Sequence, residues 1–480
     1  MAKWMVRKKV ISVIVLLLIV FILGAVLPYA WQPKVSRNMT EQFQPDDFYG
    51  ASETGERACI ISDNETALEE RIRLISQAEK RIILSTFEFD ADESGKDVLS
   101  ALMAAAERGV EVSVIADGFP GVLQFPGNPY FHAFTGTPGV EMKVYNPVRV
   151  WKPWTLMGRL HDKYLIVDDS TYLLGGRNTY DFFLGEGTGY QNYDWDVLVW
   201  CKEKEEGAAG VLENKSVGQL LNYFDSVWYH PESKRFYSRF RQKLSSVSKA
   251  EEELKTRYAG LQKEHPDWFE ACDYEEKTFP VNQIRLLSNP VQTGVKEPVV
   301  FYQMTELMKS AREEVRFHTP YIICNDWMLE RLKEVCQSVD SVQMMTNSVA
   351  NNGNPFGAMD YQYHKQKILD TGVEILEYDG GVSYHGKCFA IDDRLSGIGS
   401  FNWDMRSAYL DTELMLVLDS EGLNRQLREV MKQYEKESLK VRKDGTVRIP
   451  DGLEPQQMGK KKEWMLKVLH WIGGWARFLM

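Results

Sequence analysis

Two copies of one short pattern combine residue types that can carry out chemistry at phosphorus. The pattern is a His, a Lys two residues later, and an Asp five residues after the Lys. Its copies are His161, Lys163 and Asp168, and His385, Lys387 and Asp392. The chain has eight His, and two of them meeting both conditions by chance is on the order of 1 in 2000 at average composition. The pattern therefore indicates a site built from two matching parts.

Each copy is followed by a second matching stretch, which reads Gly175-Gly176-Arg177-Asn178 after the first and Gly399-Ser400-Phe401-Asn402 after the second. His161 and Lys163 are two residues apart, so their side chains leave the same face of a strand. The small residues of the following turn let the backbone approach a bound group closely, and Asn178 and Asn402 offer amide donors.

Pseudo-twofold packing of the two copies would place two His, two Lys and two Asn around one concavity. The cations and amides would hold the non-bridging oxygens of a phosphodiester. One His would attack phosphorus, while the other would protonate the leaving oxygen. This chemistry needs no metal and no cofactor. The six Cys have no C-x-x-C spacing and no His-rich neighbour, so they predict neither a zinc site nor a dense disulfide framework.

The elements that must position these residues also occur twice. The first set is a helical pattern (67–81), an apolar run (82–89), a helix (about 96–108) and a buried strand (110–117). The second set is 302–314, 315–323, 326–338 and 341–348. This alternation predicts an α/β fold, with a mixed or mainly parallel sheet covered by helices in each of two similar halves.

We divide the chain accordingly: basic stub and membrane anchor (1–31), linker (32–56), first half (57–202), connecting helical region (203–280), second half (281–440) and C-terminal tail (441–480). The connecting region carries charge runs such as KEKEE (202–206) and KAEEELK (249–255). Alternating charges of this kind are typical of a solvated helix face.

The N-terminal segment Val10–Leu27 contains no charge and is long enough to cross the hydrocarbon layer. A cleaved signal peptide would look similar, but Pro28 stands near the candidate cleavage point, where a small residue is wanted. We therefore predict one uncleaved transmembrane helix. Four basic residues precede the span (Lys3, Arg7, Lys8 and Lys9) and two follow it (Lys34 and Arg37). This excess predicts a cytoplasmic N-terminus and an extracytoplasmic body.

Two Trp-rich segments have alternative interpretations. The tail Lys460–Met480 places three Trp (Trp464, Trp471 and Trp475) beside a basic cluster, which suits either a helix at a membrane interface or a helix packed on the domain. The stretch with Trp151, Trp154 and Met157, just before the first motif, is either ordinary core or a loop that contacts lipid.

The doubled motif with its G-[GS]-x-N turns resembles the phospholipase D superfamily. The stretches TPYII, MTNSVANNGNPFGAMDYQYHKQKILDTGVEILEY and GSFNWDMRSAYLDTE are similar to its bacterial cardiolipin synthase branch. The resemblance covers most of residues 57–440. It implies one motif in each half, catalysis through a phosphohistidine, and no metal.

The resemblance also assigns carboxylates to the site. It places Glu413 where the family has a carboxylate that hydrogen-bonds the catalytic His, and Asp196 as the counterpart of Glu413 in the first half. One departure is that the usual Asn-x-Glu reads Asp411-Thr412-Glu413 here. We assign Asp168 and Asp392 to structural hydrogen bonds at the strand end.

Three functions remain open. The first is a membrane phosphatidyltransferase that makes cardiolipin and glycerol from two phosphatidylglycerols, with phosphatidylethanolamine as another candidate substrate. The second is a hydrolase with the same site, acting on phospholipid or nucleic acid, and the third is a non-catalytic membrane scaffold. The formal charge of -11 and the membrane anchor disfavour nucleic acid as a partner. The oligomeric state is not indicated.

Overall fold

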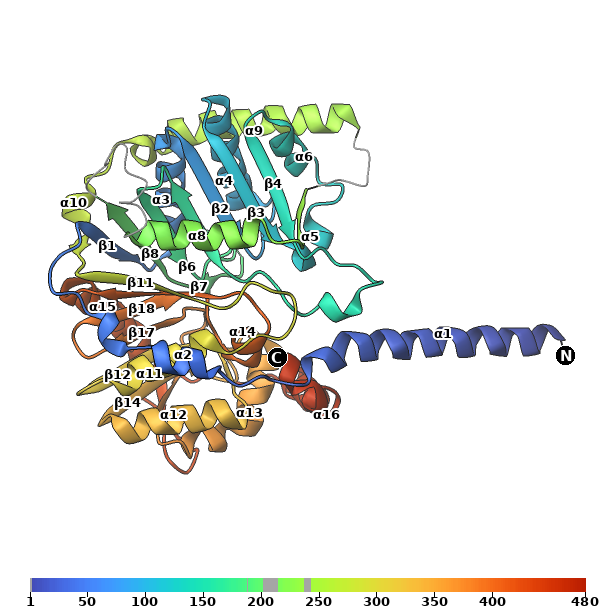
Figure 1. Ribbon diagram of the computed structural model, residues 1–480, viewed down its shortest axis with the longest axis vertical. Coiled ribbons are helices and arrows are strands. Elements are labelled where there is room, and N and C mark those ends of the chain that lie inside the picture. Colours follow the sequence, from blue (N-terminus) through green and yellow to red (C-terminus); the bar gives the residue numbers. More distant parts are fainter. Residues whose placement is uncertain (1, 188, 202–214, 237–242) are drawn as a thin grey trace.

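Two nine-stranded sheets with matching strand order form the body of the protein (Figure 1). The computed structural model describes residues 2–187, 189–201, 215–236 and 243–480. The first sheet runs β10 (Phe279–Pro280), β1 (Glu56–Ile61), β8 (Asp196–Cys201), β6 (Thr171–Gly175), β5 (Lys163–Val167), β2 (Arg81–Thr86), β3 (Glu111–Asp117), β4 (Val140–Tyr145) and β9 (Ser233–Arg235).

The second sheet repeats this order. It runs β11 (Gln283–Ser288), β20 (Leu414–Asp419), β18 (Leu395–Gly399), β17 (Cys388–Ile391), β12 (Glu314–His318), β14 (Ser341–Asn347), β15 (Glu374–Tyr378), β21 (Ser438–Val441) and β22 (Val447–Arg448). In each sheet three neighbouring strands are parallel, β2-β3-β4 and β12-β14-β15, and the other pairs are antiparallel. The predicted α/β fold of two similar halves is thus confirmed, with mixed sheets.

Helices cover the first sheet on both faces. They are α3 (Asn64–Gln77), α4 (Glu93–Glu107), α5 (Gly118–Gln124), α6 (Pro129–Gly136), α8 (Ser216–Trp228), α9 (Leu244–Glu264) and α10 (Tyr274–Lys277). Because both faces are covered, every residue of the apolar strands β5 and β6 is buried. The helix predicted over 67–81 begins three residues earlier, because the Asp63 side chain caps α3 by accepting a hydrogen bond from Thr66 N (2.7 Å).

The second sheet has a matching set: α11 (Val299–Lys309), α12 (Asp326–Ser338), α13 (Pro355–Leu369), α14 (Met405–Tyr409) and α15 (Glu421–Lys436). Two helices link the halves reciprocally. Gln219 on α8 exchanges hydrogen bonds with the backbone of β11, and Gln426 on α15 accepts one from Ile60 N in β1 (2.9 Å). A single buried apolar cluster therefore runs between the two sheets and joins them.

The connecting region supplies parts of the first half as well as surface helices. Strand β9 pairs with β4, β10 pairs with β1, and α9 packs on α4 and α6 through buried residues that include Leu254. The charge run 202–206 lies outside the described residues.

The N-terminal helix α1 (Ala2–Val26) continues into a short 3-10 turn, η1 (Leu27–Tyr29), and projects away from the body (Figure 1). Among the described residues it is the one helix long and apolar enough to span a membrane, over Arg7–Tyr29. Its side chains are mostly exposed, so it is not a core helix. The linker after it contains α2 (Arg37–Gln42) and a second 3-10 turn, η2 (Pro45–Phe48).

The C-terminal tail ends in α16 (Lys460–Gly473) and η5 (Gly474–Leu479), and one of its faces packs on the domain. Leu466 is fully buried against Ala358 and Met359 of α13. Arg477 donates to both carboxylate oxygens of Asp360 (2.5 and 2.9 Å). The other face of α16 and η5 leaves three Trp exposed, Trp464, Trp471 and Trp475. The tail is thus docked by one face and presents aromatic rings on the other.

Candidate active site

The two His–Lys pairs stand at the beginning of equivalent strands. His161 and Lys163 lead into β5, and His385 and Lys387 lead into β17. The His side chains are 14% and 22% exposed, whereas both Lys side chains are buried. Solvent therefore reaches the rings while the ammonium groups lie behind them.

Asp168 and Asp392 lie at the opposite ends of the same strands. Both adopt left-handed backbone conformations, with φ of 50° and 47°. The Asp168 carboxylate accepts hydrogen bonds from three consecutive backbone N–H groups at 79–81, and Asp392 does the same at 312–314. These contacts tie the strand end to the neighbouring strand, so both Asp have structural surroundings away from the His rings.

The ring of each His is held by a carboxylate from the other half. His161 Nδ1 lies 2.8 Å from Glu413 Oε1, and His385 Nδ1 lies 2.6 Å from Asp194 Oδ2. Where the carboxylate is ionised it can only accept, so Nδ1 then carries the proton and Nε2 keeps its lone pair. An aromatic edge contact supports each ring, from Phe87 at 5.3 Å and from Phe183 at 5.1 Å.

The expected counterpart of Glu413 was Asp196, and this assignment is wrong. Asp196 Oδ2 accepts hydrogen bonds from Arg71 (2.9 Å) and Arg177 (3.3 Å), in a buried cluster of the first half. The residue that holds His385 is Asp194, two positions earlier.

Sheet register explains the correction. Gly175 at the end of β6 pairs with Asp196, whereas Gly399 at the end of β18 pairs with Met415. Asp196 is therefore equivalent to Met415, and the residues two positions before each pair are Asp194 and Glu413. Aligning the triplets Asp194-Trp195-Asp196 and Asp411-Thr412-Glu413 end to end shifts this correspondence by two residues.

Backbone contacts across the pseudo-twofold axis hold the two motifs together. Before the first motif, Thr412 N donates to Arg159 O (2.9 Å), and His161 N donates to Thr412 Oγ1 (3.1 Å). Before the second, His385 N donates to Tyr193 O (2.6 Å), next to the parallel pair of β16 (Ser383–Tyr384) with β7 (Asn192–Tyr193). The segment that carries each carboxylate is thus bonded to the segment that carries its His.

The turns after the strands differ in a way that suits the two carboxylates. In the second half, Ser400 Oγ donates to Glu413 Oε2 (2.5 Å), and Ser407 Oγ donates to Oε1 (2.6 Å). In the first half the position of Ser400 is taken by Gly176. A Cβ at Gly176 would stand 2.2 Å from Asp194 Oδ1, so the shorter Asp reaches its His only because this residue has no side chain.

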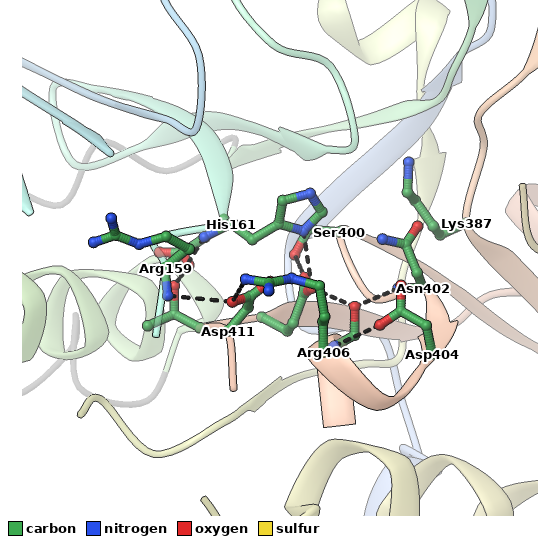
Figure 2. A network of polar contacts seen from close by, with 12 residues as sticks. Arg159, His161, Lys387, Ser400, Asn402, Asp404, Arg406 and Asp411 are labelled. Atoms are coloured by element: carbon green, nitrogen blue, oxygen red, sulfur yellow. Dashed lines mark hydrogen bonds and ion pairs between the residues drawn. The ribbon is translucent and has the colours of Figure 1, made fainter. Parts of the chain in front are cut away.

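A polar network that includes Asp404, Arg406 and Asp411 lies below the His161 ring (Figure 2), and Ser407 connects it to Glu413. Ser407 N donates to Asp404 Oδ1 (2.6 Å), which fixes the serine beside Glu413. Asp411, at the departure from the usual Asn, accepts from Arg406 Nη2 (2.9 Å) and Arg159 N (3.2 Å). The carboxylate at this position is therefore neutralised by Arg406.

The two Lys interact differently with their surroundings. Lys387 Nζ donates to Asp194 Oδ2 (3.2 Å) and to the backbone oxygen of His385. Lys163 Nζ donates to the backbone oxygen of His161 (2.5 Å). Burial lowers the pKa of Lys163 to about 7, and it also lowers that of Lys387. The two turn amides are buried, and Asn402 Nδ2 donates to Tyr321 Oη (3.1 Å).

Electrostatics couple the four motif residues into one unit. Burial and the Lys387 charge lower the pKa of His385 to about 4. Burial and the Lys163 charge lower the pKa of His161 well below 6.5, with Lys387 contributing from the other half. In the protein without bound substrate, both imidazoles are therefore neutral at pH 7. A bound anion beside them would favour the imidazolium form.

The pKa values of the two carboxylates that hold the His rings, Glu413 and Asp194, shift in opposite directions. Burial raises the pKa of Glu413 to about 8, partly opposed by the Lys163 charge and by hydrogen bonds from Ser400 and Ser407. Burial would also raise the pKa of Asp194, but the Lys387 charge and the hydrogen bond from His385 lower it below its usual range. The first-half carboxylate is thus the more strongly ionised of the two. Among the described residues no group of three or more His, Cys, Asp or Glu could hold a metal ion.

Sequence comparison relates this architecture to one family. The family described as "Cardiolipin synthase, PLD-like domain" matches residues 72–228 and 304–435, which include both motifs. The chain is 27% identical to cardiolipin synthase C of Escherichia coli, over 83% of this chain and 89% of the relative. It is 24% identical to cardiolipin synthase 1 of Staphylococcus epidermidis, over 80% of this chain and 69% of the relative.

Structural comparison gives the same fold. The crystal structure of phosphatidylserine synthase from Haemophilus influenzae superposes with a TM-score of 0.61, covering 88% of this chain and 95% of that one. The two sequences are 15% identical, so the similarity concerns the arrangement of the two halves.

Proposed function

The chain belongs to the phospholipase D-like cardiolipin synthase family, and from this we propose that it is a membrane phosphatidyltransferase whose two motifs form one active site. The observation that carries the proposal is the exchange of carboxylates: His161 with Glu413 and His385 with Asp194. Because each half supplies a carboxylate to the other, neither half contains a complete site.

In the proposed first step, His161 Nε2 attacks the phosphorus of phosphatidylglycerol. The bond between phosphorus and the oxygen of the headgroup glycerol breaks, and His385 gives its proton to that oxygen. Glycerol leaves and the phosphatidyl group remains on His161. Lys163, Lys387 and the two turn amides of Asn178 and Asn402 hold the non-bridging oxygens while negative charge shifts between them.

In the second step, the hydroxyl of another lipid headgroup attacks phosphorus. His385 takes the hydroxyl proton, the bond from phosphorus to His161 breaks, and cardiolipin is formed. The carboxylate on each Nδ1 supports both steps, because it stabilises the imidazolium and keeps Nε2 directed at the reacting atoms. Assigning His161 as the nucleophile rests on analogy with the superfamily.

The nucleophile can be identified by trapping. Full-length protein is mixed with labelled phosphatidylglycerol, quenched within milliseconds, and digested for peptide mapping. We expect the phosphoryl adduct on the peptide that contains His161. An adduct on the peptide that contains His385 would reverse the two roles and leave the single-site proposal intact.

Transfer and hydrolysis share the same intermediate, so the product decides between them. We expect cardiolipin and glycerol as the main products from phosphatidylglycerol bilayers without added divalent cation, and phosphatidic acid as a minor one. Mass spectrometry of the lipid extract reads both, and added phosphatidylethanolamine tests the second candidate substrate. Mostly phosphatidic acid would indicate a phospholipase, and no product would indicate a scaffold.

We also propose that the body lies outside the cytoplasm, with α1 as the anchor. The excess of basic residues before the span supports this orientation. A reporter that is active only in the cytoplasm, fused after Met480, should be silent; an active reporter would reverse the topology and would not affect the chemistry.

A further inference from the structure

The end of the membrane span is bonded to the loop that precedes the first motif. Tyr29 Oη donates to Trp154 O (2.5 Å) and accepts from Met157 N (3.3 Å). Pro153, in the 3-10 turn η3 (Pro153–Thr155), lies against α1, since a Cβ on Gly24 would be 3.0 Å from Pro153 Cγ. The loop therefore packs along the side of the span as well as at its end.

This contact fixes how deep the loop lies. Gly24 precedes Tyr29 by five residues within the apolar span Arg7–Tyr29, a rise of about 8 Å. A loop that touches Gly24 must lie at the depth of the lipid headgroups or below when α1 crosses a bilayer. Its Trp side chains suit that depth: Trp151 is 59% exposed and Trp154 is also exposed. Neither is core, whereas Met157 packs against the apolar cluster of the second half.

Two further elements present apolar side chains on the same side of the molecule. The short helix α5 follows β3 and exposes Phe119, Val122 and Leu123, the last at 89%. In the second half, α16 and η5 expose their Trp residues, with Trp471 at 85%. Figure 1 shows α5 and α16 on the side from which α1 leaves the body.

The geometry points to one lipid-contacting rim made of α5, the loop 150–154 and α16, and its occupant is the anionic phospholipid bilayer that α1 enters. The inference rests on the membrane anchorage in the proposed function and not on the reaction. Continuity with the span favours a bilayer over a protein partner, as do the exposed Lys460 and Lys461 at the start of α16, which suit anionic headgroups.

The rim would also bring lipid to the site. The loop 150–154 ends seven residues before His161. At the other side, Gln124, the last residue of α5, donates to Glu88 Oε1 (2.9 Å), and Glu88 is next to Phe87, which contacts the His161 ring. Lipids beneath the rim would thus enter from the membrane plane, without first crossing water.

Photo-crosslinking tests the rim directly. Full-length protein is reconstituted into bilayers that contain phosphatidylglycerol with a photoreactive diazirine in its acyl chain, irradiated, digested and mapped. We expect labelled peptides from α5, the loop 150–154 and α16 in addition to α1, and only background labelling of α12, which serves as the control element. Labelling confined to α1, or equal on α12, would overturn the inference.

A pair of substitutions at one exposed position provides the matched control. Leu123→Asp should reduce labelling of α5 by about threefold or more, because a charge withdraws from the acyl region, whereas Leu123→Phe should retain it. If both variants label like the unchanged protein, α5 is not at the bilayer. Cardiolipin formation is measured in the same samples: a labelled rim without product would contradict the proposed function and leave the rim intact, while product without a labelled rim would do the reverse.

Discussion

His161 is held by Glu413, a residue 252 positions later in the chain and in the other half of the fold, through a contact of 2.8 Å. The ring that we propose as nucleophile therefore acquires its acceptor only when the two sheets have docked. The matching contact of His385 with Asp194 runs in the opposite direction. A site of this kind should fail as a unit when any member is removed.

Replacing either His should abolish turnover. His161→Asn and His385→Asn should each lower kcat for cardiolipin formation by about 10³-fold or more, because attack and proton transfer occur at one phosphorus. His265→Asn, in the connecting region beside Trp268, is the control and should retain activity. Two variants that each kept about half of the activity would contradict a single site.

Substitutions at Asp194 and Asp196 should have different effects, because Asp194 holds His385 and Asp196 does not. Asp194→Asn should lower kcat by about 10²- to 10⁴-fold, since the ring of His385 loses its ionised acceptor. Asp196→Asn should instead lower the free energy of unfolding by about 3 kcal/mol, because Arg71 and Arg177 are left buried without their partner. Kinetics together with thermal unfolding distinguish the two, and the opposite assignment of effects would restore Asp196 to the site.

The close approach at Gly176 predicts that a single methyl group is enough to damage the site. Gly176→Ala should displace Asp194 and lower kcat by about 10²-fold or more, with the protein still folded by circular dichroism. Gly136→Ala is the matched control, because a Cβ there meets nothing within 4 Å. Unchanged activity in Gly176→Ala would show that Asp194 can hold His385 from a different position.

The lowered pKa of Lys163 predicts weaker substrate binding in alkaline solution. At a pKa of about 7, the ammonium is lost as the pH rises through 7, and an anionic phosphodiester binds the protonated form. The KM for phosphatidylglycerol diluted in a neutral bilayer should therefore rise between pH 7 and 9, by up to tenfold per pH unit. Proton uptake by His385 on binding acts in the same direction. A KM that is constant over this range would mean that Lys163 stays charged in the site.

Much of the architecture could be predicted because the patterns that specify it are local. The repeated helix and strand patterns predict the parallel strands of each half. The spacing of His161 and Lys163 predicts that their side chains share one face, and this prediction needs no knowledge of the rest of the fold. Spacing could not identify Asp194, because its equivalence to Glu413 depends on how β8 and β20 align with their neighbours. That register is set by pairing between strands that are distant in sequence.

The roles of Ser400 and Ser407 also could not be predicted from the sequence. Ser400 was visible in the turn, but its role depends on the length of the Glu413 side chain opposite it, and Ser407 reaches the site through α14. The sequence indicates the Trp-rich loop and the tail of the rim but not α5. This helix is too short to show a periodic pattern, and the exposure of its side chains depends on where β3 ends.

The hydrogen bond between Tyr29 and the backbone at Trp154 joins α1, the proposed membrane span, to a loop a few residues from His161. A span tilts when the bilayer is thinner than its apolar length and straightens when the bilayer thickens. Through this hydrogen bond, a change in the tilt of α1 would shift the loop that precedes His161. We therefore expect the rate of the enzyme to depend on bilayer thickness and on acyl-chain length.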